Sequence, residues 1–224
     1  MNIAQYIDHT LLKPTATSND INQLCEEARN YRFAAVCVPP PCVSGAKKYL
    51  TGSDVKVATV IGFPFGYSVP AAKLAEAEQA TADGADELDV VINLVALRAA
   101  DTAYLTAEIE PIVALAHQNG RLVKVIIESG ILTDAEIVVC CNLYTAANVD
   151  FVKTSTGYAE KGASVAAVQL MRQHLPSSIQ IKASGGIRTF EFAQELVAAG
   201  ATRLGCSASV AIVTGAKAAG NSGY

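Results

Sequence analysis

The stretch Val149-Asp150-Phe151-Val152-Lys153-Thr154-Ser155-Thr156-Gly157 decides how this chain folds and where its chemistry lies. A short β-type run ends in a lysine, and small, turn-forming residues follow it. Side chains alternate along a strand, so Phe151 and Lys153 should face one side and Val152 the other. Lysine is seldom fully buried without a partner or a purpose. At the carboxyl end of a parallel strand, where α/β folds build active sites, Lys153 is either a reactive amine or a lysine that reaches solvent or pairs with a carboxylate.

Strand-like and helix-like segments alternate along the whole sequence. Strands are expected at residues 6–12, 33–38, 55–61, 86–92, 122–127, 149–154, 179–183 and 202–206. Helices are expected at residues 19–31, 43–49, 71–83, 102–118, 133–147, 164–174 and 190–199. Eight strands that alternate with helices predict a single-domain (β/α)8 TIM barrel over residues 1–224, with a flexible tail from about residue 214. An open doubly wound sheet is the rival fold, but no Gly-x-Gly-x-x-Gly turn follows the first strand.

The composition limits the classes of function. Hydrophobic residues make up 51% of the sequence, which indicates a well-filled core, yet no apolar run approaches the ~20 residues needed to cross a bilayer. The first residues lack the basic start and apolar segment of a signal peptide. A net charge of -4 argues against a nucleic-acid or anionic-membrane partner. A cytoplasmic protein with a small-molecule ligand is expected.

The cysteines and histidines suggest no metal site. None of the six cysteines forms a Cys-x-x-Cys pair, and the three histidines are scattered singly. Cysteine is a common buried hydrophobe, so reduced thiols in the cytoplasm are the simplest interpretation. We expect no cofactor.

Polar residues interrupt four successive strands that otherwise consist of apolar runs. They are Asp89, Lys124, Lys153 and Lys182. Each can point inward, so in a barrel they should converge inside one mouth. Satisfied ion pairs that hold the strand register are the alternative interpretation, but buried ion pairs stabilise poorly, which favours a functional cluster.

This set of side chains limits the available chemistry. A cationic Lys182 beside Lys153 would disfavour a second positive charge and lower the pKa of Lys153. The free amine could then attack a carbonyl to form a Schiff base, whose iminium accepts electrons from a neighbouring C–H or C–C bond. Asp89 is the natural general acid or base, directly or through a water, and Asp8 could reach the same mouth from the first strand.

Two glycine-rich and serine-rich loops follow the seventh and eighth predicted strands. The first contains Gly185 and Gly186, and the second contains Gly205 and Ser207. Loops after strands seven and eight form the usual phosphate site of such barrels, because backbone amides and a helix start meet there. The paired loops favour a phosphate site over ordinary turns.

Six segments together resemble the deoxyribose-phosphate aldolases, a family of metal-independent class I aldolases. The segments are Ile7-Asp8-His9-Thr10-Leu11-Leu12-Lys13-Pro14, Ala35-Val36-Cys37-Val38, Glu87-Leu88-Asp89-Val90-Val91-Ile92-Asn93, Lys124-Val125-Ile126-Ile127-Glu128, Phe151-Val152-Lys153-Thr154-Ser155-Thr156-Gly157 and Lys182-Ala183-Ser184-Gly185-Gly186-Ile187. They run in family order from residue 7 to about 213.

The resemblance implies reversible cleavage of 2-deoxy-D-ribose 5-phosphate to acetaldehyde and D-glyceraldehyde 3-phosphate, a step of deoxyribonucleotide catabolism. It implies that Lys153 is the Schiff-base lysine, Lys182 the lysine that perturbs it and Asp89 the proton-transfer carboxylate. It also implies a homodimer. The substrate-binding residues that it suggests are Asp8, Cys37, Lys124, Thr154, Gly185, Gly186, Gly205 and Ser207, although a packing role suits Cys37 equally well.

The sequence departs from the family at two positions near the predicted phosphate site. Tyr158 stands where some members have a lysine, and Ala208 stands where many have a second serine. Both changes remove phosphate-binding groups, so the preference for phosphorylated aldehydes is the property they would alter. The chain also ends in Tyr224, as in some relatives, and our hypothesis is that this hydroxyl assists proton transfer.

Three other functions remain open. Another Schiff-base barrel, such as a transaldolase-like or ketose-phosphate aldolase, would use a different donor. A phosphosugar isomerase or synthase would use acid–base chemistry without a covalent adduct. A non-catalytic phosphate-binding barrel would leave Lys153 with an ordinary high pKa.

Overall fold

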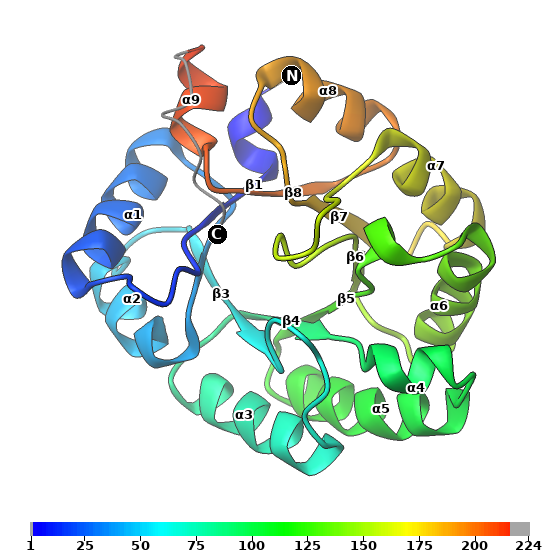
Figure 1. The fold of residues 1–224 in the computed structure, drawn as a ribbon. Coiled ribbons are helices and arrows are strands. Elements are labelled where there is room, and N and C mark those ends of the chain that lie inside the picture. The colour runs from blue at the N-terminus through cyan, green and yellow to red at the C-terminus, as the bar shows by residue number, and fades with distance from the viewer. Residues whose placement is uncertain (1, 216–224) are drawn as a thin grey trace.

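A closed barrel of eight parallel strands forms the centre of the molecule (Figure 1). The computed structural model describes residues 2–215. The strands are β1 (Ile7–Thr10), β2 (Ala35–Val38), β3 (Lys56–Ile61), β4 (Glu87–Val91), β5 (Leu122–Ile126), β6 (Phe151–Lys153), β7 (Gln180–Ser184) and β8 (Arg203–Cys206). Each pairs in parallel with the next along the chain, and β8 closes on β1. The predicted (β/α)8 TIM barrel is confirmed.

Helices surround the barrel as an outer ring (Figure 1). They are α1 (Ser18–Tyr31), α2 (Val43–Tyr49), α3 (Pro70–Ala82), α4 (Leu94–Arg98), α5 (Thr102–Gln118), α6 (Asp134–Ala146), α7 (Val165–His174), α8 (Phe190–Ala198) and α9 (Ser209–Thr214). Three short 3₁₀ helices are η1 (Ile3–Tyr6), η2 (Pro40–Cys42) and η3 (Ser129–Ile131). The sequence did not predict α4 and α9, because five or six residues are too few to show a helical period.

Local signals fix where the longer helices begin. Thr17 caps α1 and forms a capping box with Asp20, whose carboxylate accepts the Thr17 backbone N–H. Thr133 and Glu136 form the same reciprocal arrangement at the start of α6. Such boxes satisfy backbone N–H groups that have no partner within the helix, so they set the point where each strand-to-helix loop ends.

The alternation of side chains along each strand separates two environments. In β6, Val152 packs into the large apolar core, whereas Phe151 lies inside the barrel with its ring 5.9 Å from Lys124 Nζ. The predicted opposite orientation of Phe151 and Val152 is therefore confirmed, although β6 is shorter than the predicted 149–154. Apolar side chains fill the space between strands and helices, and the polar strand residues are left to face the barrel interior.

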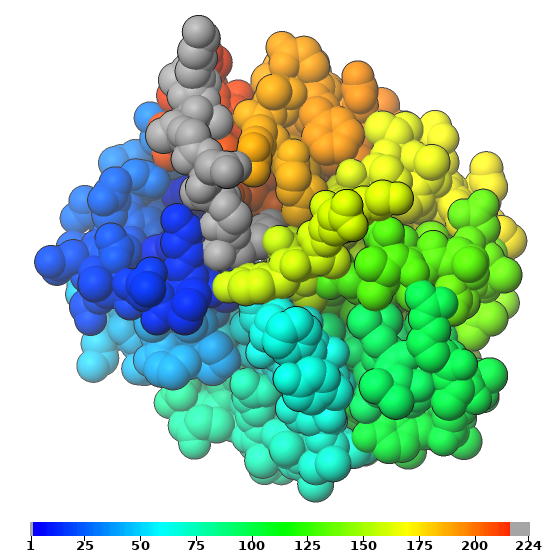
Figure 2. Space-filling model, viewed as in Figure 1, coloured from blue at the N-terminus to red at the C-terminus, as the bar shows by residue number. Residues whose placement is uncertain are grey.

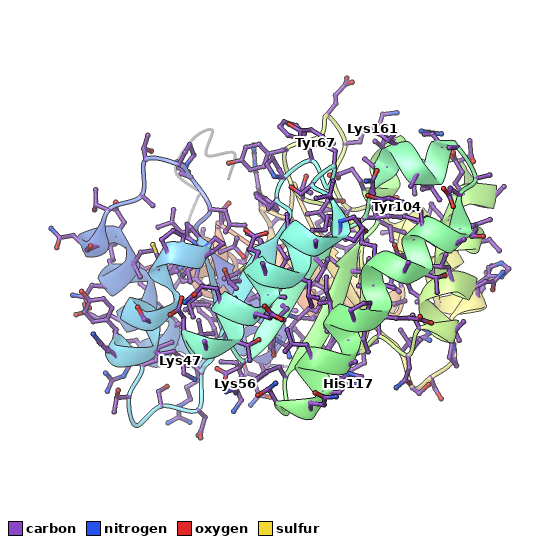
Figure 3. All side chains as sticks on the ribbon, turned by 90° about the horizontal axis from the view of Figure 1, so that it is seen from below. Lys47, Lys56, Tyr67, Tyr104, His117 and Lys161 are labelled. Carbon is purple, nitrogen blue, oxygen red and sulfur yellow. The ribbon has the colours of Figure 1, made fainter. Side chains whose placement is uncertain are left out.

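The carboxyl ends of the strands form one end of the barrel, which we call the mouth. Figure 3 shows Tyr67, Tyr104 and Lys161 at this end, and Lys47, Lys56 and His117 at the opposite end. Within residues 2–215, every helix is too short or too polar to cross a membrane.

Candidate active site

One aspartate gathers the three strand lysines. Asp89, in the middle of β4, accepts hydrogen bonds from Lys124 Nζ at 2.7 Å, from Lys153 Nζ at 2.7 Å and from Lys182 Nζ at 2.8 Å. Their positions follow from strand register, because Asp89 lies opposite Lys124 and Lys153 lies opposite Lys182. The structure thus brings together the four polar residues that were expected to converge.

Asp8 joins this group from β1. Lys182 Nζ donates a hydrogen bond to Asp8 Oδ2, and Lys124 Nζ lies 3.8 Å from the same oxygen. Lys182 therefore lies between two carboxylates, Asp8 and Asp89. Lys153 has Asp89 as its ion-pair partner among residues 2–215. Among these residues, Lys182 thus contacts two carboxylates, whereas Lys153 contacts one.

The unequal surroundings separate the two lysines electrostatically. Burial, reinforced by the charge of Lys182, lowers the pKa of Lys153 below its usual value although Asp89 opposes the shift. Burial also disfavours the charge of Lys182, but Asp8 and Asp89 together hold its pKa well above the usual value. The three lysines keep the pKa of Asp89 well below its usual range despite complete burial. The site can therefore present a free amine on Lys153 beside a protonated Lys182 and an ionised Asp89.

The opposite wall of the barrel interior is apolar. Cys37 packs with Leu12, Ala58 and Val60, and the half-buried ring of Phe63 covers them. Burial raises the pKa of the Cys37 thiol to about 11, with a further contribution from Asp89. Cys37 therefore remains a neutral thiol in this wall, and a packing role accounts for its contacts.

Thr154, the residue after Lys153, is turned toward the backbone of the next strand. Its hydroxyl donates to the Ser184 carbonyl at 3.2 Å and accepts the Ser184 N–H at 3.0 Å. These bonds tie the end of β6 to the end of β7, so they fix the backbone on which the two lysines stand.

A cavity of about 210 Å³ lies between the loops that follow β6, β7 and β8. Gly185, Gly186, Gly205 and Ser207 all line it, together with Arg188. Gly185 has φ 87°, and a Cβ there would lie only 3.0 Å from Gly162 Cα, so a side chain at this position is strained and crowded. The structure thus gathers the residues expected to bind phosphate, and Arg188 adds a cation that the sequence interpretation did not select.

The loop after β6 crosses the mouth. Tyr158 donates its hydroxyl hydrogen to the Leu12 carbonyl at 3.2 Å, and its ring meets Phe63 edge-on at 5.4 Å between centroids. Figure 2 shows this yellow segment lying against the blue chain after β1 and the cyan loop after β3. Tyr158 is therefore directed away from the 210 Å³ cavity.

The sequence interpretation missed three buried or half-buried charged residues near these side chains. Glu87 Oε2 lies 2.5 Å from Lys124 Nζ, and Arg203 Nη1 lies 2.7 Å from Asp8 Oδ1. Glu128, two residues after β5, accepts hydrogen bonds from the Thr156 backbone and hydroxyl, and burial raises its pKa. Glu87 precedes Asp89 by two residues and so shares its face of the strand, a signal that could have identified it.

The described part of the chain contains no group of three or more His, Cys, Asp or Glu side chains arranged to hold a metal ion. Tyr224 lies outside the described residues.

Comparison with known proteins defines the class of enzyme as an aldolase, which is a lyase. Deoxyribose-phosphate aldolase of Thermococcus gammatolerans is 52% identical over 219 residues, with 97% of both chains covered. That of Streptococcus gordonii is 49% identical over 221 residues, covering 99% of this chain and 100% of the relative. The tetrameric deoxyribose phosphate aldolase of Aeropyrum pernix superimposes with a TM-score of 0.87 at 36% identity, covering 95% of this chain and 89% of that one.

The model of the DeoC/LacD family aldolases matches residues 2–215, which is nearly the whole chain. The chain therefore belongs to the DeoC/LacD family of aldolases.

Proposed function

We propose that this aldolase reversibly cleaves 2-deoxy-D-ribose 5-phosphate to acetaldehyde and D-glyceraldehyde 3-phosphate through a Schiff base on Lys153. The observation that carries the proposal is the position of Lys153, a buried lysine with a lowered pKa whose Nζ lies 2.7 Å from Asp89 and which is paired in register with Lys182. The names of the full-length relatives supply the substrate class.

The first chemical step follows from the state of the amine. Neutral Lys153 attacks the C1 aldehyde of the open-chain sugar, and loss of water leaves an iminium. The iminium withdraws electrons, so the C2–C3 bond breaks once a base removes the proton of the C3 hydroxyl. D-Glyceraldehyde 3-phosphate leaves, and an enamine of the two-carbon donor remains on Lys153. Protonation at C2 and hydrolysis of the iminium release acetaldehyde and restore the amine.

Asp89 and Lys182 have different roles in this scheme. Asp89 moves protons through a water, because its own oxygens already accept bonds from three lysines. Lys182 remains a cation between Asp8 and Asp89, and it disfavours a second positive charge on Lys153. Lys124 and Asp8 hold these two groups in place.

The cavity of about 210 Å³ is assigned to the substrate phosphate. Backbone groups of Gly185 and Gly186, the Ser207 hydroxyl and the Arg188 guanidinium would bind it. The apolar wall of Leu12, Cys37 and Phe63 suits the unsubstituted C2 methylene of a deoxy sugar, since it offers no partner for a hydroxyl there.

The proposal is tested by trapping with acetaldehyde and borohydride, followed by peptide mass mapping. An ethyl adduct on Lys153 is expected, and cleavage of deoxyribose 5-phosphate should be measured on the same preparation. Lys73→Met is the matched control and should still form the Lys153 adduct. Lys73 is also buried, but it lies outside the barrel and pairs with Glu108. A folded protein without any modified lysine would favour acid–base isomerase chemistry instead, and an adduct on Lys182 would exchange the two lysine roles.

We further propose that the enzyme acts in the cytoplasm, in deoxyribonucleotide catabolism, as a homodimer. The solved relative from Aeropyrum pernix is tetrameric, so light scattering of the purified protein is the direct test of the oligomeric state.

A further inference from the structure

Two charged residues at the amino ends of the strands take no part in the proposed chemistry. Glu87 is the first residue of β4 and Arg203 the first residue of β8. Arg203 Nη1 lies 2.7 Å from Asp8 Oδ1 and 3.2 Å from Glu87 Oε2, and its guanidinium lies 5.5 Å from the centre of the Phe151 ring. Glu87 in turn contacts Lys124 at 2.5 Å. The pair therefore continues the ion network down to the end of the barrel opposite the mouth.

The whole network has more cations than carboxylates. We call it the interior cluster, and its members are Asp8, Glu87, Asp89, Lys124, Lys153, Lys182 and Arg203. When all are ionised, four positive charges meet three negative charges. An excess charge inside a barrel is costly, because desolvation is not repaid by a partner. Loss of a proton from one of the four basic groups would bring the net charge of the cluster to zero.

The contacts indicate which of the four basic groups loses its proton. Arginine stays protonated in proteins. Lys124 is held by Glu87 and Asp89, and Lys182 by Asp8 and Asp89. Lys153 contacts one carboxylate oxygen, Asp89 Oδ2, and shares it with Lys182. Lys153 is thus the group that loses least by giving up its proton.

We propose that Glu87 and Arg203 are charge-balancing positioning residues that determine, from the far end of the barrel, whether Lys153 carries a proton. Arg203 pairs with both Asp8 and Glu87 and is the fourth cation beside three carboxylates, so the cluster has one positive charge in excess until Lys153 loses its proton. Glu87 has the opposite effect, since its negative charge offsets part of that excess. This inference rests on the proposed role of Lys153 as the nucleophile.

Two further ionisable groups, Cys37 and Glu128, interact with Lys153 without belonging to the interior cluster, and both are present in every variant used below, so the direction of each expected shift is independent of them. Cys37 on β2 stays a thiol, because burial raises its pKa to about 11. Glu128, two residues after β5, accepts a hydrogen bond from Thr156, and burial raises its pKa although Thr156 and Lys153 oppose the shift. The pKa of Lys153 itself is lowered by burial and by Lys182, in agreement with the neutral state that the contacts select.

The test measures the rate of ethyl-adduct formation on Lys153 between pH 6 and 10, using short pulses of acetaldehyde and cyanoborohydride and quantifying the peptide. The rate rises with pH as the amine loses its proton. Arg203→Met removes a cation, leaves three carboxylates with three lysines, and should move this rise to higher pH by about one unit. Glu87→Gln removes an anion and should move it to lower pH by about the same amount.

Two further variants separate charge from structure. Arg203→Lys retains the charge and should keep the rise near its wild-type position. The double variant Glu87→Gln/Arg203→Met has two carboxylates and three lysines. It therefore has one positive charge in excess, as the wild type has, and its rate should rise with pH in the wild-type range. Circular dichroism checks that each variant is folded. If Arg203→Met alone does not fold, the pH profiles of Glu87→Gln and of the double variant are compared with that of the wild type instead.

The outcomes distinguish this inference from the proposed function. Absence of a Lys153 adduct in the wild-type protein would refute the proposed function. An adduct with superimposable profiles in all variants, or shifts of the same sign for Glu87→Gln and Arg203→Met, would overturn the charge-balancing role while leaving the aldolase mechanism intact.

Discussion

Two fully buried lysine sites lie on either side of the barrel wall, and they differ in charge balance. Inside, the interior cluster combines four cations with three carboxylates. Outside, Lys73 of α3 forms what we call the outer pair with Glu108 of α5, at 2.7 Å, and also donates to the Val91 carbonyl of β4 at 2.7 Å. The outer pair thus has one positive and one negative charge, and each charged group contacts the other.

Burial acts differently at the two sites. In the outer pair, burial lowers the pKa of Lys73 and raises that of Glu108, so both groups shift toward neutrality. In the interior cluster the surrounding charges outweigh burial at Lys124, Lys182 and Asp89, which stay charged, whereas Lys153 shifts toward the free amine. The difference teaches that a buried lysine becomes a candidate nucleophile when neighbouring cations compete with it for one carboxylate and it lies at an open strand end.

The largest expected effect comes from removing the amine of Lys153. Lys153→Met should lower the rate of deoxyribose 5-phosphate cleavage by about 10⁴-fold or more, since it removes the amine on which the covalent intermediate is proposed to form. Lys73→Met should leave the activity of the folded protein unchanged. Comparable activity losses in both variants, measured per folded molecule, would remove the distinction between the two sites.

The outer pair should instead control stability. Lys73→Met leaves the Glu108 carboxylate buried and without its partner, so the free energy of unfolding should fall by about 3–5 kcal/mol. Replacing both residues, in Lys73→Met/Glu108→Leu, should recover most of this loss because two apolar side chains can pack in their place. Urea denaturation followed by circular dichroism gives the three values. A double variant as unstable as the single one would argue that the pair contributes more than charge compensation.

Asp89 should affect proton transfer more than covalent trapping. Asp89→Asn removes the proposed general acid or base, and exchange of the α-protons of acetaldehyde with deuterated water should slow by about 10²- to 10³-fold. The Lys153 adduct should still form under borohydride. Glu108→Gln, the matched change in the outer pair, should leave the exchange rate per folded molecule unchanged. Equal slowing in these two variants would contradict the role assigned to Asp89.

The smallest effect is expected at the rim of the mouth, away from both lysine sites. Ser207→Ala removes one donor to the phosphate, so KM for deoxyribose 5-phosphate should rise roughly tenfold, equivalent to about 1.4 kcal/mol. The kcat/KM for unphosphorylated 2-deoxyribose should not change. A parallel loss with both substrates would assign Ser207 to the structure of the loop rather than to phosphate.

Much of the fold could be predicted from the sequence, because the signals are local. Eight continuous apolar runs, which are typical of strands buried on both faces, alternate with helical segments, and this repetition predicts a barrel. Side chains alternate between the two faces of a strand, so Asp89, Lys124, Lys153 and Lys182 can each point inward, and their convergence could also be predicted. Short elements such as α4 and α9 lack enough residues for a periodic signal.

The tertiary structure alone decided the pairing of the charges. Arg203 reaches Asp8 and Glu87 because closure of the barrel brings β8 beside β1 and across from β4, although these residues lie far apart in the sequence. Lys73 and Glu108 look like ordinary polar helix residues until α3 packs against α5. Periodicity fixes the face on which a side chain lies, but the number and sign of the charges that meet it depend on which strands close the barrel, and that balance determines whether a buried lysine is a cation or a free amine.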